Sequence, residues 1–179
     1  LLARISLEDF ESASGNDNWG WTDPETGKEY VLSGLDDGTA FVDISNPEAP
    51  VFLGKLLTAT EPSSWRDIKV YQNHAFIVSE ASGHGMQVFD LTRLRAVSTP
   101  PETFTADTHF TDFGRAHNIV INETSGYAYI VGTSRTGTYA GGALFVNIQN
   151  PTMPISEGGF GAGGYSHDAQ VITYTGPDS

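Results

Sequence analysis

Short apolar strands recur along the chain, and each of three of them opens with a pair of polar residues. These pairs begin at residues 66, 117 and 167, which are 51 and then 50 residues apart, and a fourth pair lies a further 50 residues back, before an aromatic run. Such a fixed spacing predicts a structural repeat of about fifty residues. The pairs are Asn16-Asp17, Arg66-Asp67, His117-Asn118 and His167-Asp168.

A second pattern repeats inside the first. The apolar segments 40–44, 87–91 and 144–148 each carry one Asp or Asn, namely Asp43, Asp90 and Asn147. Two of these segments run into an Asn-Pro turn, at 45–50 and 149–154. Because these polar positions repeat almost unchanged, we expect them to form turns or hydrogen bonds between strands rather than a site.

The apolar spacing within each repeat is two residues rather than 3.6, so the pattern predicts strands and no helix. Turn residues divide each repeat into four strands. In the first repeat these are 18–22, 28–34, 38–45 and 50–57; in the second, 67–71, 74–80, 85–91 and 102–106; in the third, 118–122, 127–133, 142–148 and 154–160.

Four strands in every fifty residues are typical of a β-propeller, an all-β fold of four-stranded antiparallel blades. We expect blades at 16–58, 66–106 and 117–161. Residues 1–10 are expected to form the outer strand of a preceding blade, and residues 167–175 the inner strand of the next one. Three blades do not close a ring, so we expect the chain to be part of a propeller of about six to eight blades.

Four motifs resemble the choice-of-anchor B family of LVIVD-repeat proteins: residues 16–24, 64–70, 116–122 and 165–170. Segments 40–44 and 144–148 are similar to degenerate copies of the Leu-Val-Ile-Val-Asp strand that names the repeat. The resemblance implies a bacterial, exported β-propeller that is held at the cell surface. It implies no established biochemical role.

Composition narrows the classes of partner. The chain has 22 acidic and 9 basic residues and a formal net charge of −13, and its Lys and Arg residues form no stripe that could follow phosphates, so we expect no nucleic-acid partner. The sequence contains no apolar run long enough to be a transmembrane segment. It contains no cysteine, so a metal site would need His, carboxylate or carbonyl ligands.

Inner strands line the channel of a propeller, so the polar pairs should converge near one channel mouth. Carboxylate and amide oxygens favour Ca²⁺, whereas nearby histidines favour Zn²⁺. The possible metal ligands are Asp17, Asp67, Asn118 and Asp168. The full candidate set is Asn16, Asp17, Trp65, Arg66, Asp67, Arg115, His117, Asn118, Tyr165, His167 and Asp168.

The same pairs have a structural interpretation, in which each bonds to the backbone of the neighbouring blade. Three functions therefore stay open. The first is an extracellular or cell-surface binding module with a small ligand or metal at the channel mouth, and with protein or glycan partners. The second is a metal-dependent hydrolase or lactonase with His117 or His167 as general base. The third is a scaffold.

Overall fold

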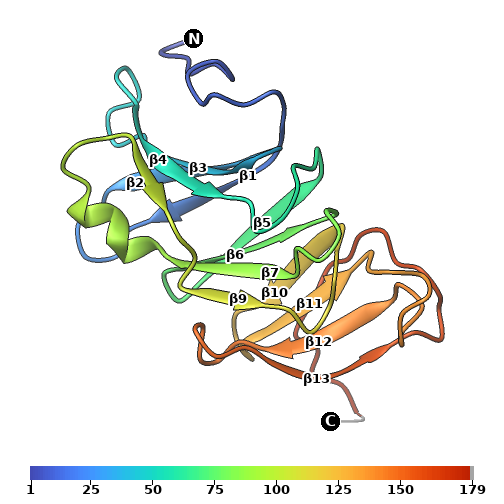
Figure 1. Ribbon diagram of the computed structural model, residues 1–179. Coiled ribbons are helices and arrows are strands. Elements are labelled where there is room, and N and C mark those ends of the chain that lie inside the picture. The colour runs from blue at the N-terminus through green and yellow to red at the C-terminus, as the bar shows by residue number, and fades with distance from the viewer. Residues whose placement is uncertain (178–179) are drawn as a thin grey trace.

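The computed structural model describes residues 1–177, which form thirteen strands and one short 3₁₀ helix in three separate sheets. Figure 1 shows the sheets following one another from the N-terminal to the C-terminal part of the chain. The all-β fold expected from the apolar spacing is confirmed.

The first sheet contains four antiparallel strands in sequence order, β1-β2-β3-β4, with a fifth strand, β8, added beside β4. Its four sequential strands agree with the expected ranges to within a few residues. They are β1 (Gly15–Thr22), β2 (Glu29–Leu35), β3 (Gly38–Asp43) and β4 (Val51–Leu57).

The second sheet has the order β5-β6-β7-β9, all antiparallel. The third has the order β10-β11-β12-β13, also antiparallel. The strands of the second sheet are β5 (Arg66–Tyr71), β6 (His74–Ser79), β7 (Met86–Asp90) and β9 (Thr108–Phe110); those of the third are β10 (Asn118–Asn122), β11 (Tyr127–Val131), β12 (Ala143–Asn147) and β13 (Ile155–Phe160).

The expectation that residues 102–106 complete the second sheet is wrong. The strand β8 (Glu102–Phe104) instead pairs in parallel with β4 of the first sheet, and β9 completes the second sheet, which therefore extends beyond residue 106. Phe104 packs against Phe41 of the first sheet and also against Phe89 of the second. Gly54 permits the approach, because a Cβ atom there would lie 2.1 Å from the Glu102 carbonyl oxygen.

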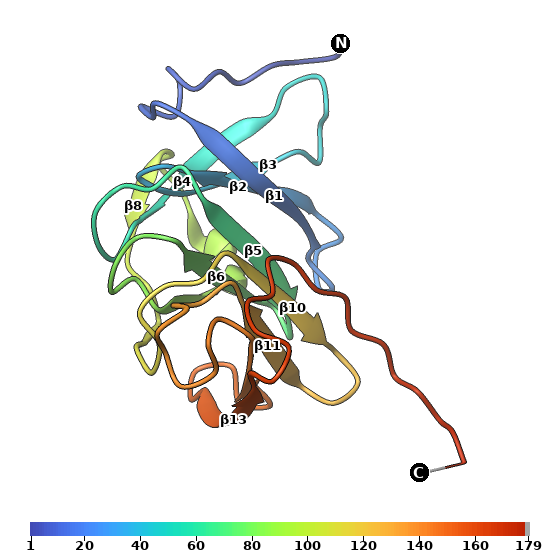
Figure 2. The same ribbon diagram turned by 90° about the vertical axis from the view of Figure 1, so that its right-hand side faces the viewer.

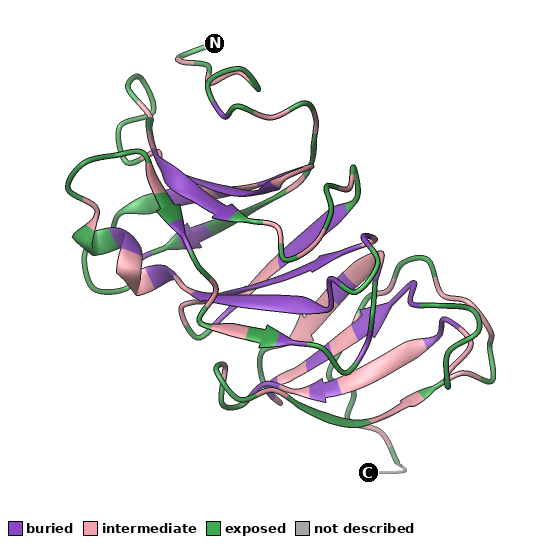
Figure 3. Ribbon diagram, viewed as in Figure 1, coloured by how far each residue is buried: buried purple, intermediate pink, exposed green. Residues whose placement is uncertain are grey.

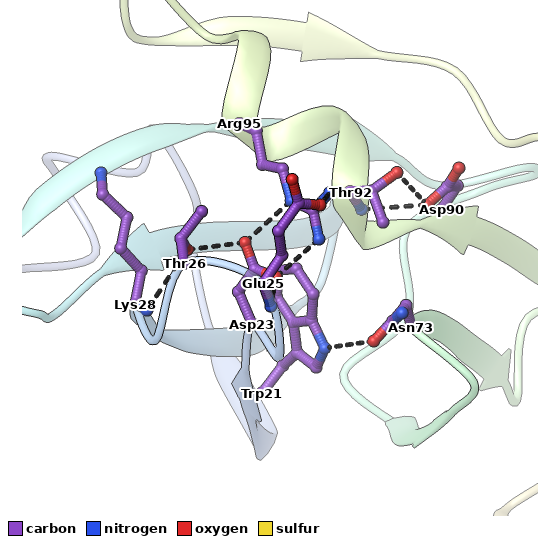
Figure 4. A network of polar contacts seen from close by, with 9 residues as sticks. All are labelled: Trp21, Asp23, Glu25, Thr26, Lys28, Asn73, Asp90, Thr92 and Arg95. Atoms are coloured by element: carbon purple, nitrogen blue, oxygen red, sulfur yellow. Dashed lines mark hydrogen bonds and ion pairs between the residues drawn. The ribbon is translucent and has the colours of Figure 1, made fainter.

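A 3₁₀ helix, η1 (Leu91–Ala96), was not expected, because the apolar residues of the sequence are spaced two apart. Asp90 begins it by accepting a hydrogen bond from the Thr92 amide. The helix then projects Arg95 onto Asp23 of the first sheet, where the guanidinium makes two hydrogen bonds of 2.8 and 2.6 Å to the carboxylate (Figure 4). The loop after β7 thus ties the second sheet to the first.

The three sheets pack through their first strands. Strand β5 lies beside β1 and also beside β10, and Figure 2 shows these three strands in succession. One apolar cluster joins the first two sheets and a second joins the last two. Strands β6 and β7 of the middle sheet are accordingly almost wholly buried, whereas the strands of the third sheet are mostly half-buried, and β13 is largely exposed (Figure 3).

The two terminal segments differ from expectation. Residues 1–10 form no strand, because Ser6 and Asp9 bond to each other's backbone and side chain and close a local turn. Residues 167–175 also have no strand pairing, although Asn122 of β10 donates a hydrogen bond to Thr173. Over residues 1–177, no helix has both the length and the apolar character needed to cross a membrane.

Candidate functional site

The aspartates of the first two polar pairs bind the backbone of the next sheet. Asp17, in β1, accepts a hydrogen bond of 3.0 Å from the Ile68 amide in β5. Asp67, in β5, accepts one of 2.7 Å from the Ile119 amide in β10. We call this arrangement a clamp: the second residue of a polar pair accepts the N–H of the residue that follows the next pair. The clamp geometry supports the structural interpretation for these two residues.

The carboxylates of Asp17 and Asp67 also share a cation of the chain itself. The Lys69 ammonium lies 2.8 Å from Asp67 Oδ1 and 3.9 Å from Asp17 Oδ2, and 4.5 Å from the centre of the Trp19 ring. Lys69 therefore supplies the positive charge that the sequence interpretation assigned to a metal ion.

The four expected metal ligands do not assemble into one set. Asp168 is exposed and accepts a hydrogen bond from the adjacent Ala169 amide. Across residues 1–177, no group of three His, Asp or Glu side chains is arranged to hold a metal ion. The donor set of Asp17, Asp67, Asn118 and Asp168 thus does not fit the Ca²⁺ or Zn²⁺ site that the sequence suggested.

Burial perturbs the titration of Asp67, whose exposed fraction is 6%. Desolvation and the hydrogen bond with Asp17 raise the pKa of the Asp67 carboxyl to about 6, and they outweigh the opposing effects of Lys69 and of the Ile119 amide. The clamp between the second and third sheets therefore holds a carboxyl group in poorly solvated surroundings that favour its protonated form.

Arg66, another member of the candidate set, is buried inside the protein. It is only 1% exposed, and it extends from β5 into the turns of the first sheet. Its Nε donates to the Leu35 carbonyl at 2.9 Å, one terminal nitrogen donates to Thr58 Oγ1 at 2.9 Å, and the other lies 3.4 Å from His84 Nε2. Burial lowers the pKa of Arg66 to about 10.

His84 is the buried partner of this arginine. Burial, followed by the positive charge of Arg66, lowers the pKa of the imidazole to about 3, so the ring is neutral at neutral pH. A neutral ring can accept from the guanidinium at Nε2 and donate from Nδ1 to Thr58, 3.4 Å away. The other member of the first pair, Asn16, also serves the junction, because its Nδ2 donates to the Arg66 carbonyl at 3.0 Å.

A different group of candidates gathers at the start of β10, and we call it the His117 cluster. His117 Nδ1 lies 2.5 Å from Glu80 Oε1, and Arg115 lies 3.4 Å from the other oxygen of the same carboxylate. The rings of Trp65 and His167 flank His117, with centroids 5.7 and 3.9 Å from its own. The cluster consists of Trp65, Glu80, Arg115, His117 and His167.

This cluster combines groups suited to recognition of a polar molecule. Trp65 is 51% exposed, and its carbonyl is held by hydrogen bonds from the Glu80 amide and the Ser79 hydroxyl. Glu80 orients the imidazole of His117 through Nδ1, which leaves Nε2 as the ring nitrogen able to meet a ligand or move a proton.

Tyr165, which the sequence placed in the same candidate set, makes its contacts elsewhere. The Arg135 guanidinium stacks 3.7 Å from the centre of its ring, and the ring packs close to Gly141, where a Cβ atom would lie 2.6 Å from it. Tyr165 therefore anchors the chain after β13 against the loop between β11 and β12.

Sequence reasoning missed Glu80 and Lys69. The pairing of β5 with β6 sets Arg66 opposite Ser79, so Glu80 follows at the same sheet edge as Trp65. Hairpin register could have placed Glu80 there, because the turn at residues 72–73 is short and fixes the pairing. The position of Lys69 between two aspartates from different sheets had no such local signal.

The repeat pattern has a counterpart among known families. Residues 35–58 match the LVIVD repeat. The match runs from the end of β2 through β3 and β4, and it includes the expected copy of the motif at 40–44. No curated protein and no solved structure matches the chain.

The polar residue of this LVIVD strand forms a turn, as expected. Asp43 Oδ1 accepts a hydrogen bond of 2.9 Å from the Ser45 amide. Asp90 and Asn147, at the corresponding positions of the other two sheets, accept from the amides of Thr92 and Gln149. All three bonds join residue i to residue i+2, which explains why these positions repeat.

Proposed function

We propose that the three sheets are consecutive blades of a β-propeller and that the chain is an extracellular binding module, with its ligand site at the His117 cluster. Three features support the blade arrangement: the repeat of about fifty residues, the LVIVD match, and the succession of first strands β1, β5 and β10. In such a fold these strands line the channel, and the cluster lies where β5 and β10 begin.

The half-exposed indole of Trp65 beside the oriented imidazole of His117 is the observation that carries this proposal. A large aromatic face next to hydrogen-bonding groups suits a ligand with both an apolar and a polar side. A saccharide ring has this character, because its C–H face stacks on indole and its hydroxyls bond to His117 and Arg115. We therefore propose a saccharide as the ligand class.

The resemblance to the choice-of-anchor B family supports a bacterial cell-surface location, where glycans and other extracellular proteins are the available partners. The net charge of −13 disfavours polyanionic partners over a longer range. A neutral or cationic saccharide is thus a better candidate than a highly sulfated one.

Calorimetric titration with a panel of neutral and amino sugars tests the proposal. We expect Trp65→Ala to abolish binding of any sugar that the parent chain binds. Trp19→Ala is the matched control, because Trp19 is also a partly exposed tryptophan but lies outside the cluster, and it should retain binding. Loss of binding in the control alone, or no binding of any sugar by the parent chain, would contradict the proposal.

The Glu80–His117 pair favours a hydrolase as a second candidate. A carboxylate that orients imidazole is the usual arrangement of a general base. We would assay ester and lactone hydrolysis with the parent chain and with His117→Asn. Activity that survives this substitution, or that is absent from the parent chain, would exclude the hydrolytic role of His117.

A further inference from the structure

The clamps follow a simple rule of sequence. Asp17 and Asp67 are the second residues of their polar pairs, and each accepts the amide of the residue that follows the next pair, Ile68 or Ile119. The residue at the corresponding place in the third sheet is Asn118, and the residue that follows the next pair is Ala169. The rule therefore predicts a hydrogen bond from the Ala169 amide to Asn118 Oδ1.

In the structure, neither the acceptor nor the donor of this predicted hydrogen bond takes part in it. Asn118 Oδ1 is buried and has no hydrogen-bond partner among residues 1–177. The Ala169 amide bonds instead to the carboxylate of its own neighbour Asp168, at 2.7 Å. A buried acceptor without a donor is costly, because it has lost water and gained nothing in exchange.

The chain after β13 already runs alongside β10 (Figure 2). Its far end is tied by the hydrogen bond of 3.2 Å between Asn122 and Thr173, and the ring of His167 lies on that of His117 at its near end. Between these points an open pocket of about 360 Å³ is lined by residues 169–172, by Val120 and Ile121 of β10, and by Trp19, Lys69, Val70 and Glu123. Ala169 and Val171 of this segment are half-buried, whereas Gln170 and Ile172 are exposed.

From these contacts we infer that the face of β10 is a docking surface for residues 168–172 of this chain, and that Asn118 is the third clamp. In the docked form the Ala169 amide leaves Asp168 and donates to Asn118 Oδ1, and Val171 moves toward Ile121. The segment becomes an extended strand beside β10, in the place that β10 itself holds beside β5.

Docking also has a consequence for the Asp168 carboxylate. Once its own neighbour no longer occupies it, the Asp168 carboxylate is free to accept an amide from a further strand, as Asp17 and Asp67 do. The same kind of clamp would thus recur at each successive junction. The inference rests on the blade arrangement proposed above but not on the ligand.

Amide hydrogen exchange of Ala169, measured by NMR on the whole chain, tests the inference with two crossed variants. If Asn118 is the acceptor, Asn118→Ala should speed exchange of the Ala169 amide about tenfold, the effect of losing one hydrogen bond, and Asp168→Ala should leave it slow. The opposite result, slow exchange in Asn118→Ala and fast exchange in Asp168→Ala, would overturn the inference, as would an unprotected Ala169 amide in the parent chain.

Two controls separate docking from damage to the sheet. The Ile119 amide, which Asp67 holds, should stay protected in every variant and reports that β5 and β10 remain together. Asn118→Asp installs the carboxylate found in the other two clamps, and it should slow exchange of the Ala169 amide; faster exchange there counts against the inference. Saccharide binding is measured separately, so failure of the ligand proposal leaves this result interpretable.

Discussion

The junction between the first and second sheets and the outer edge of the third sheet use the same kind of residues in opposite ways. At the junction the polar pair Arg66-Asp67 is almost fully buried, and its side chains bond to backbone and side chains of neighbouring sheets. At the edge the pair His167-Asp168 is exposed. A repeated polar pair is therefore structural where another sheet follows it, as is also the case for Asn16 and Asp17.

The intermediate pair shows the change within two adjacent residues. Asn118 lies in β10 with a buried oxygen, whereas His117 precedes the strand and joins the partly exposed cluster with Glu80 and Trp65. The other first members do not follow His117, because Arg66 is buried and Asn16 donates to the Arg66 carbonyl at the junction. Within the pair His117-Asn118 alone, the residue in the strand is packed and the residue before the strand belongs to the partly exposed cluster.

Arg66→Ala should have the largest effect and tests the buried side of this comparison. It removes the donor to Leu35, Thr58 and His84 and leaves a cavity, so we expect a loss of about 3 kcal/mol or more in the free energy of unfolding by urea. Arg115→Ala, the same change at the exposed cluster, should cost less than about 0.5 kcal/mol. Equal losses would remove the distinction between junction and edge.

Asp67→Asn should change the pH dependence of stability. The pKa of Asp67 is about 6 in the folded chain and near 3.8 when unperturbed, so the folded chain holds a proton that the unfolded chain releases between about pH 4 and pH 6. The contribution of Asp67 is fully present below pH 4 and is lost as the pH rises through 6.

Urea unfolding at intervals from pH 3.5 to 7 measures this effect. The free energy of unfolding of the parent chain, relative to that of Asp67→Asn, should fall by an amount on the order of 3 kcal/mol across the range. A difference that stays constant with pH would contradict this prediction, because it would mean that folding leaves the pKa of Asp67 unchanged.

Asp23 should give the opposite slope, and a smaller effect, at the contact between η1 and the first sheet. The hydrogen bonds from Arg95 hold the pKa of the Asp23 carboxyl well below its usual range. Its contribution is therefore present above about pH 4 and is lost as the pH falls further. The free energy of unfolding of the parent chain should fall more steeply below pH 4 than that of Arg95→Gln; parallel curves would contradict this assignment.

Much of the strand order could be predicted because alternation and turn residues are local signals. Segment 102–106 could not be placed, since its partner depends on Phe104 reaching Phe41, which lies about sixty residues earlier in the chain. His84 carried no signal of burial, because two glycines flank it and suggest an exposed turn, yet Arg66 and Thr58 enclose it. Both outcomes depend on contacts that are distant in sequence.

The sequence by itself determined the repeat, the strands within it and the turns formed by Asp43, Asp90 and Asn147, since each of these depends on residues a few positions apart. Only the tertiary structure decided which polar residues are clamps and which belong to the His117 cluster. A carboxylate such as Asp67 can bind a metal, a ligand or an amide equally well by its chemistry. The neighbouring strand decides among them, because it brings the Ile119 amide and Lys69 to that carboxylate.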